Sequence, residues 1–393
     1  MGKIAKNDGN NLSIPGLALA HKQQVPITIQ RDKESSKKPE KLEFLEFFAG
    51  SGLVTQGLKP YFKAVWANDI CPKKAAVYTA NHSKKYFHLG SIAEVDGHSV
   101  PGAALSWASF PCQDLSLAGL NGGIHAKRSG LVWQWLRIMD AMPKHPPLLV
   151  AENVTGLLST DKGSHYRILH NALRERGYIV GALVLDAVQW VPHSRPRVFV
   201  VAVKKTAPLP VELIDTVPNW MHPAYLVSAT EGLDGFVFWK MPKPAKRKNT
   251  LADLIEWNAT TDNAAAANRK LSLISEKHRV KLEQRSEIVM PGYKRTRNGT
   301  QVLELRFDGV AGCLRTAEGG SSRQVIVLKR GDHYDTRLLT VRETARLMGA
   351  PDTYKIPGSY NDGYTAMGDA VAMPVARYLG KYLLAPLGKA LHV

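Results

Sequence analysis

One cysteine stands where a strand-length apolar segment gives way to a polar loop. Cys112 lies within residues 109–116, Ser-Phe-Pro-Cys-Gln-Asp-Leu-Ser, directly after the mainly apolar residues 103–108. Ligands of open α/β sheets bind beyond the carboxyl ends of the strands, so this position suits a nucleophilic thiolate facing a crevice. A lone cysteine is more often a small buried hydrophobic residue, and that reading stays open at this point.

Acidic and basic groups follow two other apolar segments. Glu152, Asn153 and Val154 come directly after residues 148–151, and Arg195 and Arg197 precede the apolar run 198–203. A carboxyl group and a cation near a thiol could act in acid–base and electrostatic catalysis. Taken separately, Glu152 could cap a turn and the two arginines could form a surface pair.

A glycine-rich turn predicts a cofactor site near the start of the ordered chain. Residues 42–48 are bulky and apolar enough for a buried strand, and Gly50 and Gly52 precede a helix that we expect to end near Leu58. Such a turn lets the backbone approach a cofactor closely. Asp69 ends a second strand about 20 residues further on, where an acid can bind ribose hydroxyls. A compatible alternative is that Asp69 caps a helix over residues 72–81.

Alternating elements are needed to bring these residues together. Strand-like segments recur at residues 86–89, 104–108, 148–151, 179–185 and 198–203, and residues 164–174 have a helical apolar pattern that Gly177 ends. This order predicts an α/β fold with a doubly wound, mostly parallel sheet. We expect a flexible basic tail over 1–40, a catalytic and cofactor-binding domain over 41–204, a loop-rich domain over 205–335 and a C-terminal part over 336–393.

The C-terminal part contains two further signals. Thr340 and Glu343 form a capping-box pattern for a helix that Gly349 stops. A turn over residues 368–371 then opens an apolar helix, expected to reach about Leu384 and to pack back against the first domain.

The charge points to a polyanionic partner. The 393 residues carry a formal net charge of +18, and residues 240–300 hold fourteen Lys and Arg against six Asp and Glu, with aromatic residues interleaved. Clustered cations gain affinity for nucleic acid by releasing counterions from phosphates, so we interpret this region as a nucleic-acid reader. A solvated helical surface over residues 270–285 would explain part of the charge without any function.

The composition also excludes several classes of protein. Only Cys71, Cys112 and Cys313 are present, which gives neither a disulfide framework nor a zinc site. No apolar run approaches the roughly 18 residues of a membrane span, and residues 1–20 lack the pattern of a secretory signal. We therefore expect a cytoplasmic protein without a metal.

Together these stretches resemble the DNA (cytosine-5)-methyltransferase family, over about residues 42–384. In family order, the chain has the first cofactor motif at 48–52, the ribose-binding acid at 68–69 and the nucleophile loop at 110–113. The cytosine-binding motif follows at 152–154, the paired arginines at 195–197, the scaffold motif at 337–354 and the last cofactor motif at 368–371. The basic region falls where the family has its variable target-recognition domain, so 205–335 is expected to be that domain.

The resemblance implies a Rossmann-like methyltransferase that uses S-adenosylmethionine and releases S-adenosylhomocysteine. A Cys112 thiolate adds to C6 of a flipped-out cytosine, Glu152 serves N3 and the exocyclic amine, Arg197 holds O2 or the surroundings of Cys112, and Arg195 supports Glu152 or the loop. Residues 113–128 are the expected lid. The expected cofactor residues are Phe48, Ala49, Gly50, Ser51, Gly52, Leu53, Asp69, Ile70, Ser91, Ile92, Pro111, Leu131, Asp369, Ala370 and Val371. The expected substrate residues are Pro111, Gln113, Ser116, Lys127, Arg128, Asn153 and Val154.

Three positions depart from the family pattern. Ser91 stands where an acid often reaches the adenine amine, which implies a weaker or a backbone contact. Asp369 replaces a common Asn, and an acid there would repel the carboxylate of the cofactor's methionine end. His193 replaces the usual Gln, and its role is open.

The expected partner is double-stranded DNA, with the enzyme a monomer acting on a specific sequence; a cognate restriction endonuclease is a candidate partner. Two alternatives remain: a tRNA cytosine-5 methyltransferase of the same fold, which the large basic region argues against, and a non-catalytic DNA-binding protein on a decayed methylase fold, which the intact Cys112, Glu152 and Arg197 argue against.

Overall fold

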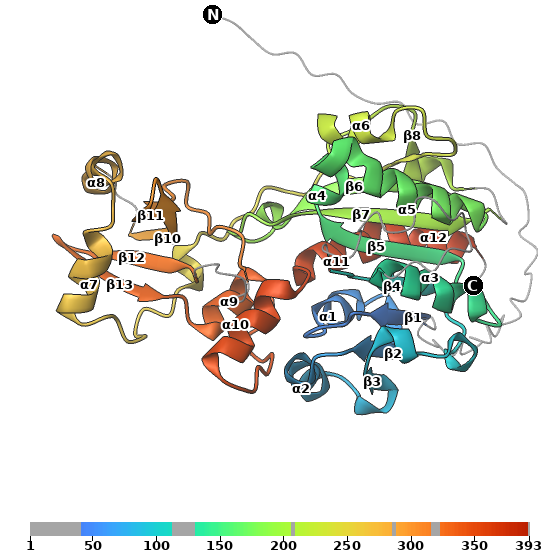
Figure 1. Ribbon diagram of the computed structural model, residues 1–393, viewed down its shortest axis with the longest axis horizontal. Helices are drawn as coiled ribbons and strands as arrows, with labels where there is room; N and C mark the ends of the chain where they lie inside the picture. The colour runs from blue at the N-terminus through green and yellow to red at the C-terminus, as the bar shows by residue number, and fades with distance from the viewer. Residues whose placement is uncertain (1–40, 112–129, 206–208, 285–287, 316–322, 392–393) are drawn as a thin grey trace, which may run out of the picture. The chain divides into compact units, whose positions relative to one another are not determined.

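The computed structural model describes residues 41–111, 130–205, 209–284, 288–315 and 323–391 (Figure 1). The expected tail over 1–40 lies outside these ranges. So do five predicted site residues: Cys112, Gln113, Ser116, Lys127 and Arg128.

The described residues form one large sheet in the order β3-β2-β1-β4-β5-β7-β6. Neighbouring strands pair in parallel from β3 to β5, whereas β7 runs antiparallel to both β5 and β6. The predicted mostly parallel sheet is confirmed. Its strands are β1 Leu42–Phe47, β2 Phe62–Asp69, β3 Phe87–Leu89, β4 Leu105–Ala108, β5 Leu148–Val154, β6 Tyr178–Asp186 and β7 Pro196–Lys204.

Side chains of β1 point alternately to the two faces of this sheet and pack in two separate hydrophobic cores. Phe44 packs in a core with residues of α1 (Leu53–Leu58), α11 (Met373–Leu379) and α12 (Ala385–Ala390). Leu45 and Phe47 pack in the other core, with α3 (Leu131–Ala141) and α5 (Ser164–Glu175). Helices therefore cover both faces, as a doubly wound sheet requires (Figure 1).

A smaller antiparallel sheet has the order β11-β10-β12-β13. One of its faces has its own core, to which Ile274 and Leu282 contribute from the segment containing α7 (Ala264–Leu271) and α8 (Glu276–Glu283). Asn298 and Gly299 join β10 to β11 with φ angles of 48° and 76°, as a two-residue hairpin turn requires. The strands are β10 Val289–Arg297, β11 Thr300–Leu305, β12 Val325–Arg330 and β13 His333–Leu338.

Several shorter elements complete the described part of the chain. They are α2 Pro72–Asn81, α4 Gly156–Ser159, α6 Ala224–Thr230, β8 Ile214–Asp215, β9 Phe238–Trp239, α9 Val341–Leu347 and α10 Tyr360–Asp369, with a π-helical turn over Gly380–Leu384. The predicted capping box is confirmed, because Thr340 accepts from the Glu343 amide and Glu343 accepts from the Thr340 amide.

The C-terminal return differs from the prediction in where it begins. Gly368 and Asp369 end α10 rather than opening a new helix, and the returning helix starts at Met373. Pro374 at its first turn favours a helix start there, because proline cannot donate the hydrogen bond that a helix interior needs. The helix from Met373 lies close to α1: a Cβ atom on Gly57 of α1 would lie 2.7 Å from the Met373 carbonyl oxygen.

Candidate active site

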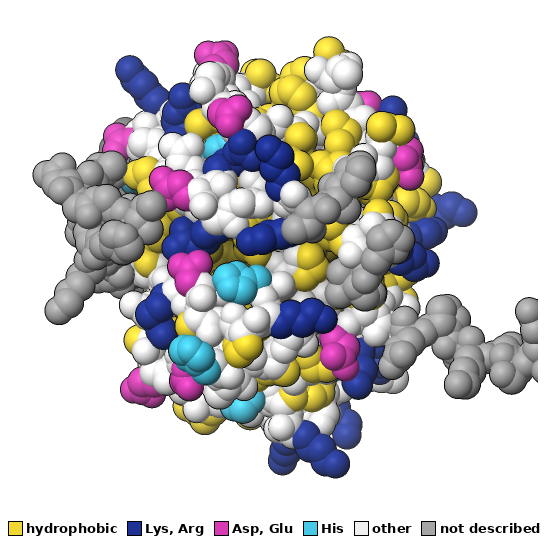
Figure 2. All heavy atoms as spheres, turned by 90° about the vertical axis from the view of Figure 1, so that its right-hand side faces the viewer, with side chains coloured by type: hydrophobic (Ala, Val, Ile, Leu, Met, Phe, Trp, Pro, Cys, Tyr) yellow, Lys and Arg dark blue, Asp and Glu magenta, His cyan; other side chains and the backbone are white. Residues whose placement is uncertain are grey.

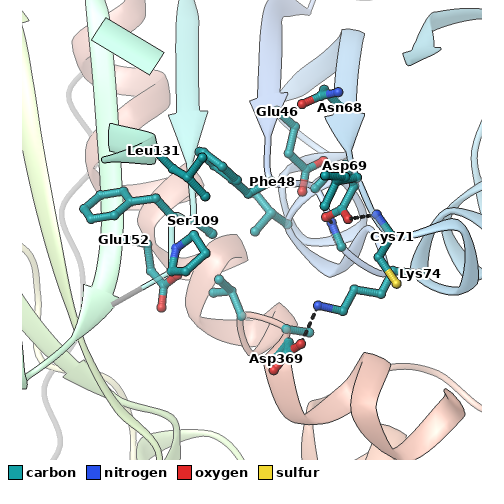
Figure 3. Close-up of a pocket in the computed structure, with 18 of the residues that line it drawn as sticks. Glu46, Phe48, Asn68, Asp69, Cys71, Lys74, Ser109, Leu131, Glu152 and Asp369 are labelled. Atoms are coloured by element: carbon teal, nitrogen blue, oxygen red, sulfur yellow. Dashed lines mark hydrogen bonds and ion pairs between the residues drawn. The ribbon is translucent and has the colours of Figure 1, made fainter. Parts of the chain in front are cut away.

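A cavity of about 370 Å³ opens at the carboxyl ends of β1, β2, β4 and β5 (Figure 3). It is lined both by predicted cofactor residues and by predicted catalytic or substrate residues. The cofactor residues are Phe48, Ala49, Gly50, Leu53, Asp69, Ile70, Ser91, Ile92, Pro111, Leu131, Asp369, Ala370 and Val371. The others are Glu152, Asn153, Val154, Arg195 and Arg197.

The turn after β1 is held in an unusual backbone conformation. Phe48, Gly50 and Gly52 all have positive φ angles, of 56°, 54° and 78°. Positive φ in a non-glycine residue such as Phe48 is uncommon and occurs most often at functional sites. Two predicted members do not line the cavity: the Ser51 hydroxyl donates to the Ala366 carbonyl at 3.2 Å, and Gly52 faces His82.

Asp69 ties this turn to the end of β2. One carboxylate oxygen accepts the Gly50 amide and the other accepts the Cys71 amide, each at 2.8 Å. The alternative that Asp69 caps α2 is wrong, because Cys71 occupies the N-cap position and no side chain caps it. Asp69 lines the cavity, and each carboxylate oxygen has a further lone pair, so the group can still accept from a ligand hydroxyl.

The neighbouring wall of the cavity combines an exposed and a buried isoleucine. Ile70 is 68% exposed and Ile92 is buried, while the Ser91 hydroxyl accepts the Ala93 amide. The Asn68 amide group donates to the carbonyl oxygens of His88 and Gly90 and so fixes the turn before Ser91. This wall could therefore make apolar contact with a flat ring of a ligand, because its Asn68 and Ser91 side chains are already hydrogen-bonded to the backbone.

Glu152 and Arg197 form a pair on adjacent antiparallel strands. Arg197 Nε lies 3.2 Å from Glu152 Oε1, and both side chains are largely buried. Burial raises the pKa of Glu152, although Arg197, Arg195 and a hydrogen bond with Ser109 oppose the increase. A buried carboxyl group with a raised pKa beside a cation is suited to holding or sharing a proton.

The segment that leads to Cys112 is anchored from β5. The Asn153 amide group donates to the Phe110 carbonyl at 3.0 Å, and the Trp107 indole donates to the Ser109 hydroxyl, also at 3.0 Å. Asn153 therefore positions this segment, and Pro111 directly after it lines the cavity. Cys112 is the next residue of the chain, beyond the end of the described range.

Arg195 does not contact Glu152 but holds three carbonyl groups. One amino group donates to Leu314 at 3.2 Å, and the other donates to Gly368 at 2.8 Å and Ala370 at 2.7 Å. Its side chain is 2% exposed, and burial followed by repulsion from Arg197 lowers its pKa to about 10. Arg195 thus fixes the turn that carries residues 368–371 against the segment that contains Leu314.

His193 supports the same junction, which gives it the role that its sequence left open. Its Nδ1 lies 3.1 Å from the Leu347 carbonyl, and its Nε2 lies 3.1 Å from the Leu314 amide, which can only donate. The ring is fully buried, and burial together with Arg195 lowers its pKa well below 6.5. A neutral His193 therefore joins the β6–β7 connection to α9 and to Leu314.

The sequence did not point to two ionisable residues of the cavity, Lys74 and Glu46. Lys74 of α2 forms an ion pair with Asp369 at the end of α10 (Figure 3). Glu46 of β1 is 1% exposed, accepts a hydrogen bond from Thr55, and has a pKa that burial raises to about 8. The signal for Glu46 was an acid near the end of a strand that is mainly apolar, whereas nothing local marked Lys74.

The described residues contain no cluster of three or more His, Cys, Asp or Glu side chains that could hold a metal ion. Within the same residues, no helix combines the length and apolar character needed to cross a membrane. On the face shown in Figure 2, Lys and Arg side chains lie among acidic and apolar ones.

Comparison with known proteins extends the likeness beyond this site. The model of the C-5 cytosine-specific DNA methylase family matches residues 42–385. The Type II methyltransferase M.BsuFI of Bacillus subtilis is 26% identical over 347 residues, covering 88% of this chain and 73% of that protein. The Type II methyltransferase M.HhaI of Haemophilus parahaemolyticus is 25% identical over 343 residues, covering 86% and 93%.

A solved structure has the same fold. The S. pombe Dnmt2 methyltransferase aligns with a TM-score of 0.57 at 19% identity, over 90% of this chain and 100% of that one. The family match spans both the large sheet and the small one and includes every motif that carried the resemblance. The chain therefore belongs to the C-5 cytosine-specific DNA methylase family and is a DNA cytosine-5 methyltransferase.

Proposed function

We propose that this enzyme transfers a methyl group from S-adenosylmethionine to C5 of a flipped-out cytosine in a specific sequence of double-stranded DNA. The attack passes through a covalent bond between Cys112 and C6. The observation that carries the proposal is the buried Glu152–Arg197 pair, which shares one cavity with the glycine turn, Asp69 and the segment leading to Cys112.

The chemistry gives each residue a task. Addition of the Cys112 thiolate to C6 makes C5 an enamine carbon that can accept the methyl group, after which the C5 proton leaves and the Cys112–C6 bond breaks. Glu152 holds a proton at N3 as negative charge develops there, and Arg197 stabilises charge at O2. Arg195 holds the surrounding turns in place. The base must leave the duplex to reach the cavity, which costs a few kcal/mol.

The cavity fits the proposed methyl donor. Its volume of about 370 Å³ lies within the usual range of about 300–1,000 Å³ for small-molecule sites. The Asp69 carboxylate suits ribose hydroxyls, and the wall of Ile70, Ile92 and Leu131 suits adenine. S-Adenosylmethionine would supply the methyl group, and no metal is required.

Residues 205–335 are proposed as the target-recognition domain. A second groove, of about 770 Å³, is lined by Tyr293, Arg295 and Arg306 and by Pro196, the residue between Arg195 and Arg197. Arginines of such a groove can bind phosphates or the edges of guanine. Exchange of residues 240–300 with those of a relative should change the methylated sequence; unchanged specificity would refute this assignment.

The bacterial relatives named Type II methyltransferases extend the proposal to a cognate restriction endonuclease and to action on DNA in the cytoplasm. We propose a monomer, because one chain supplies every residue named above.

Methyl transfer from labelled S-adenosylmethionine to duplex DNA and to tRNA tests the substrate. Duplex DNA should be labelled, and tRNA should not. With duplex DNA containing 5-fluorocytosine, the enzyme should form an adduct that survives denaturant, and Cys112→Ala should form none. Preferential labelling of tRNA would support the alternative substrate, and an adduct with Cys112→Ala would exclude Cys112 as the nucleophile.

A further inference from the structure

An ion pair crosses one side of the candidate active site. Lys74 projects from α2 and Asp369 from the end of α10, and both side chains line the cavity (Figure 3). They are partly exposed, at 21% and 39%. Burial alone would lower the pKa of Lys74, but the ion pair with Asp369 and attraction to Asp69 and Cys71 together raise it above 10.5. Lys74 is therefore a cation throughout the neutral range.

The turn that carries Asp369 is rigidly held. Arg195 donates to the carbonyl oxygens of the residues on either side, Gly368 and Ala370. Lys74 lies in the first turn of α2, five residues after Asp69, whose own carboxylate is fixed by two backbone amides. Contacts of neighbouring residues therefore hold the backbone of both Lys74 and Asp369 in place beside the cavity.

Most ionisable groups of the cavity already have a task. Asp69 suits ribose hydroxyls, and Glu152 with Arg197 suits the pyrimidine. Glu46 is hydrogen-bonded to Thr55, and Arg195 is occupied by backbone carbonyl groups. Lys74 and Asp369 offer one further cation and one further anion side by side. A free amino acid group carries the complementary charges, a carboxylate and an ammonium, and a preformed pair can bind both with little rearrangement.

We propose that Lys74 and Asp369 bind the methionine end of the methyl donor. Lys74 binds the carboxylate of the donor, and Asp369 binds the ammonium group of the donor. This inference rests on the proposed function, since it assumes an S-adenosyl ligand in this cavity. It also removes the repulsion expected from Asp369 alone, because Lys74 compensates for the replacement of Asn by Asp.

The same two helices offer a matched control. Lys73 and Asp362 also form an ion pair between α2 and α10, at 2.7 Å, but neither residue lines the cavity. If Lys74 served only to hold the helices together, loss of the cation from Lys73 would have similar consequences.

Calorimetric titration of wild type, Lys74→Met and Lys73→Met with two ligands separates these roles. S-Adenosylhomocysteine carries the amino acid group, and 5′-methylthioadenosine lacks it. Lys74→Met should weaken binding of S-adenosylhomocysteine about tenfold to hundredfold, the range for loss of a charge-assisted hydrogen bond, and should change binding of 5′-methylthioadenosine less than about twofold. Lys73→Met should change either affinity less than about twofold.

Asp369→Ala should also weaken binding of S-adenosylhomocysteine more than binding of 5′-methylthioadenosine. Retained binding of 5′-methylthioadenosine shows that each variant keeps a folded cavity. An equal loss for both ligands, or no loss in Lys74→Met, would overturn the inference. If wild type bound neither S-adenosylmethionine nor S-adenosylhomocysteine, the proposed function itself would fail.

Discussion

Replacing Glu46 with Gln should remove a pH dependence of stability that originates in β1. The Glu46 carboxyl group is 1% exposed and accepts a hydrogen bond from the Thr55 hydroxyl, which lies 3.0 Å from the Tyr78 hydroxyl. Burial raises the pKa of Glu46 from 4.5 to about 8, although the hydrogen bonds from Thr55 oppose this. The folded protein therefore keeps a proton that the unfolded chain releases.

The sign and size of the effect follow from this difference. Because the folded pKa is raised, the stabilisation is fully present below pH 4.5 and is lost as the pH rises toward about 8. Each pH unit in this window costs about 1.4 kcal/mol, which gives at most about 5 kcal/mol over the whole window. That is a large part of the roughly 5–15 kcal/mol by which a typical domain is stable.

Urea unfolding of wild type and Glu46→Gln between about pH 5 and about pH 9 measures the effect, because other titrating groups cancel in the difference. Gln cannot ionise, so the variant should gain stability relative to wild type as the pH rises. Glu43→Gln is the control, since Glu43 lies on the same strand with a side chain that is 47% exposed. Parallel curves for wild type and Glu46→Gln would refute a buried, protonated Glu46.

Three other substitutions test the site and its support. Arg195→Met should lower the free energy of unfolding by about 3–5 kcal/mol, because three buried carbonyl groups lose their donor; a loss below about 1 kcal/mol in urea would contradict this. Glu152→Gln should reduce kcat for methyl transfer about 10²- to 10⁴-fold. Its affinity for S-adenosylhomocysteine, measured by calorimetry, should stay within about twofold of wild type, and unchanged kcat would exclude proton transfer by Glu152. Arg337→Met should cost about 3–5 kcal/mol in urea unfolding, because Glu343, whose oxygens lie 2.6 and 2.7 Å from the Arg337 amino groups, would remain buried without its partner; unchanged stability would show that this pair is dispensable.

Local patterns were sufficient for the large sheet. The apolar strand and glycine turn before α1, the capping box at Thr340 and the helix over Ser164–Glu175 are each encoded within a few neighbouring residues. The small sheet was largely missed. Its Asn298-Gly299 turn is a hairpin signal, but β10 is highly charged and its buried and exposed residues do not alternate, so no strand pattern marked it.

The candidate site shows the same division. Asp69 and Glu152 could be selected as candidates because each lies near the carboxyl end of a mainly apolar strand, and the order of the motifs supported both. The partners of Arg195 could not be found, because backbone carbonyl groups more than a hundred residues away leave no trace in the side-chain pattern. The partner of Asp369 could not be found for a similar reason, since Lys74 comes from a helix far away in the sequence.

Bisulfite sequencing of DNA from cells that express this chain tests the central claim most directly. Cytosines within one short sequence should resist conversion in cells that express the wild type, and all cytosines should convert in cells that express Cys112→Ala. Complete conversion with the wild-type enzyme, or protection that persists with Cys112→Ala, would contradict the account.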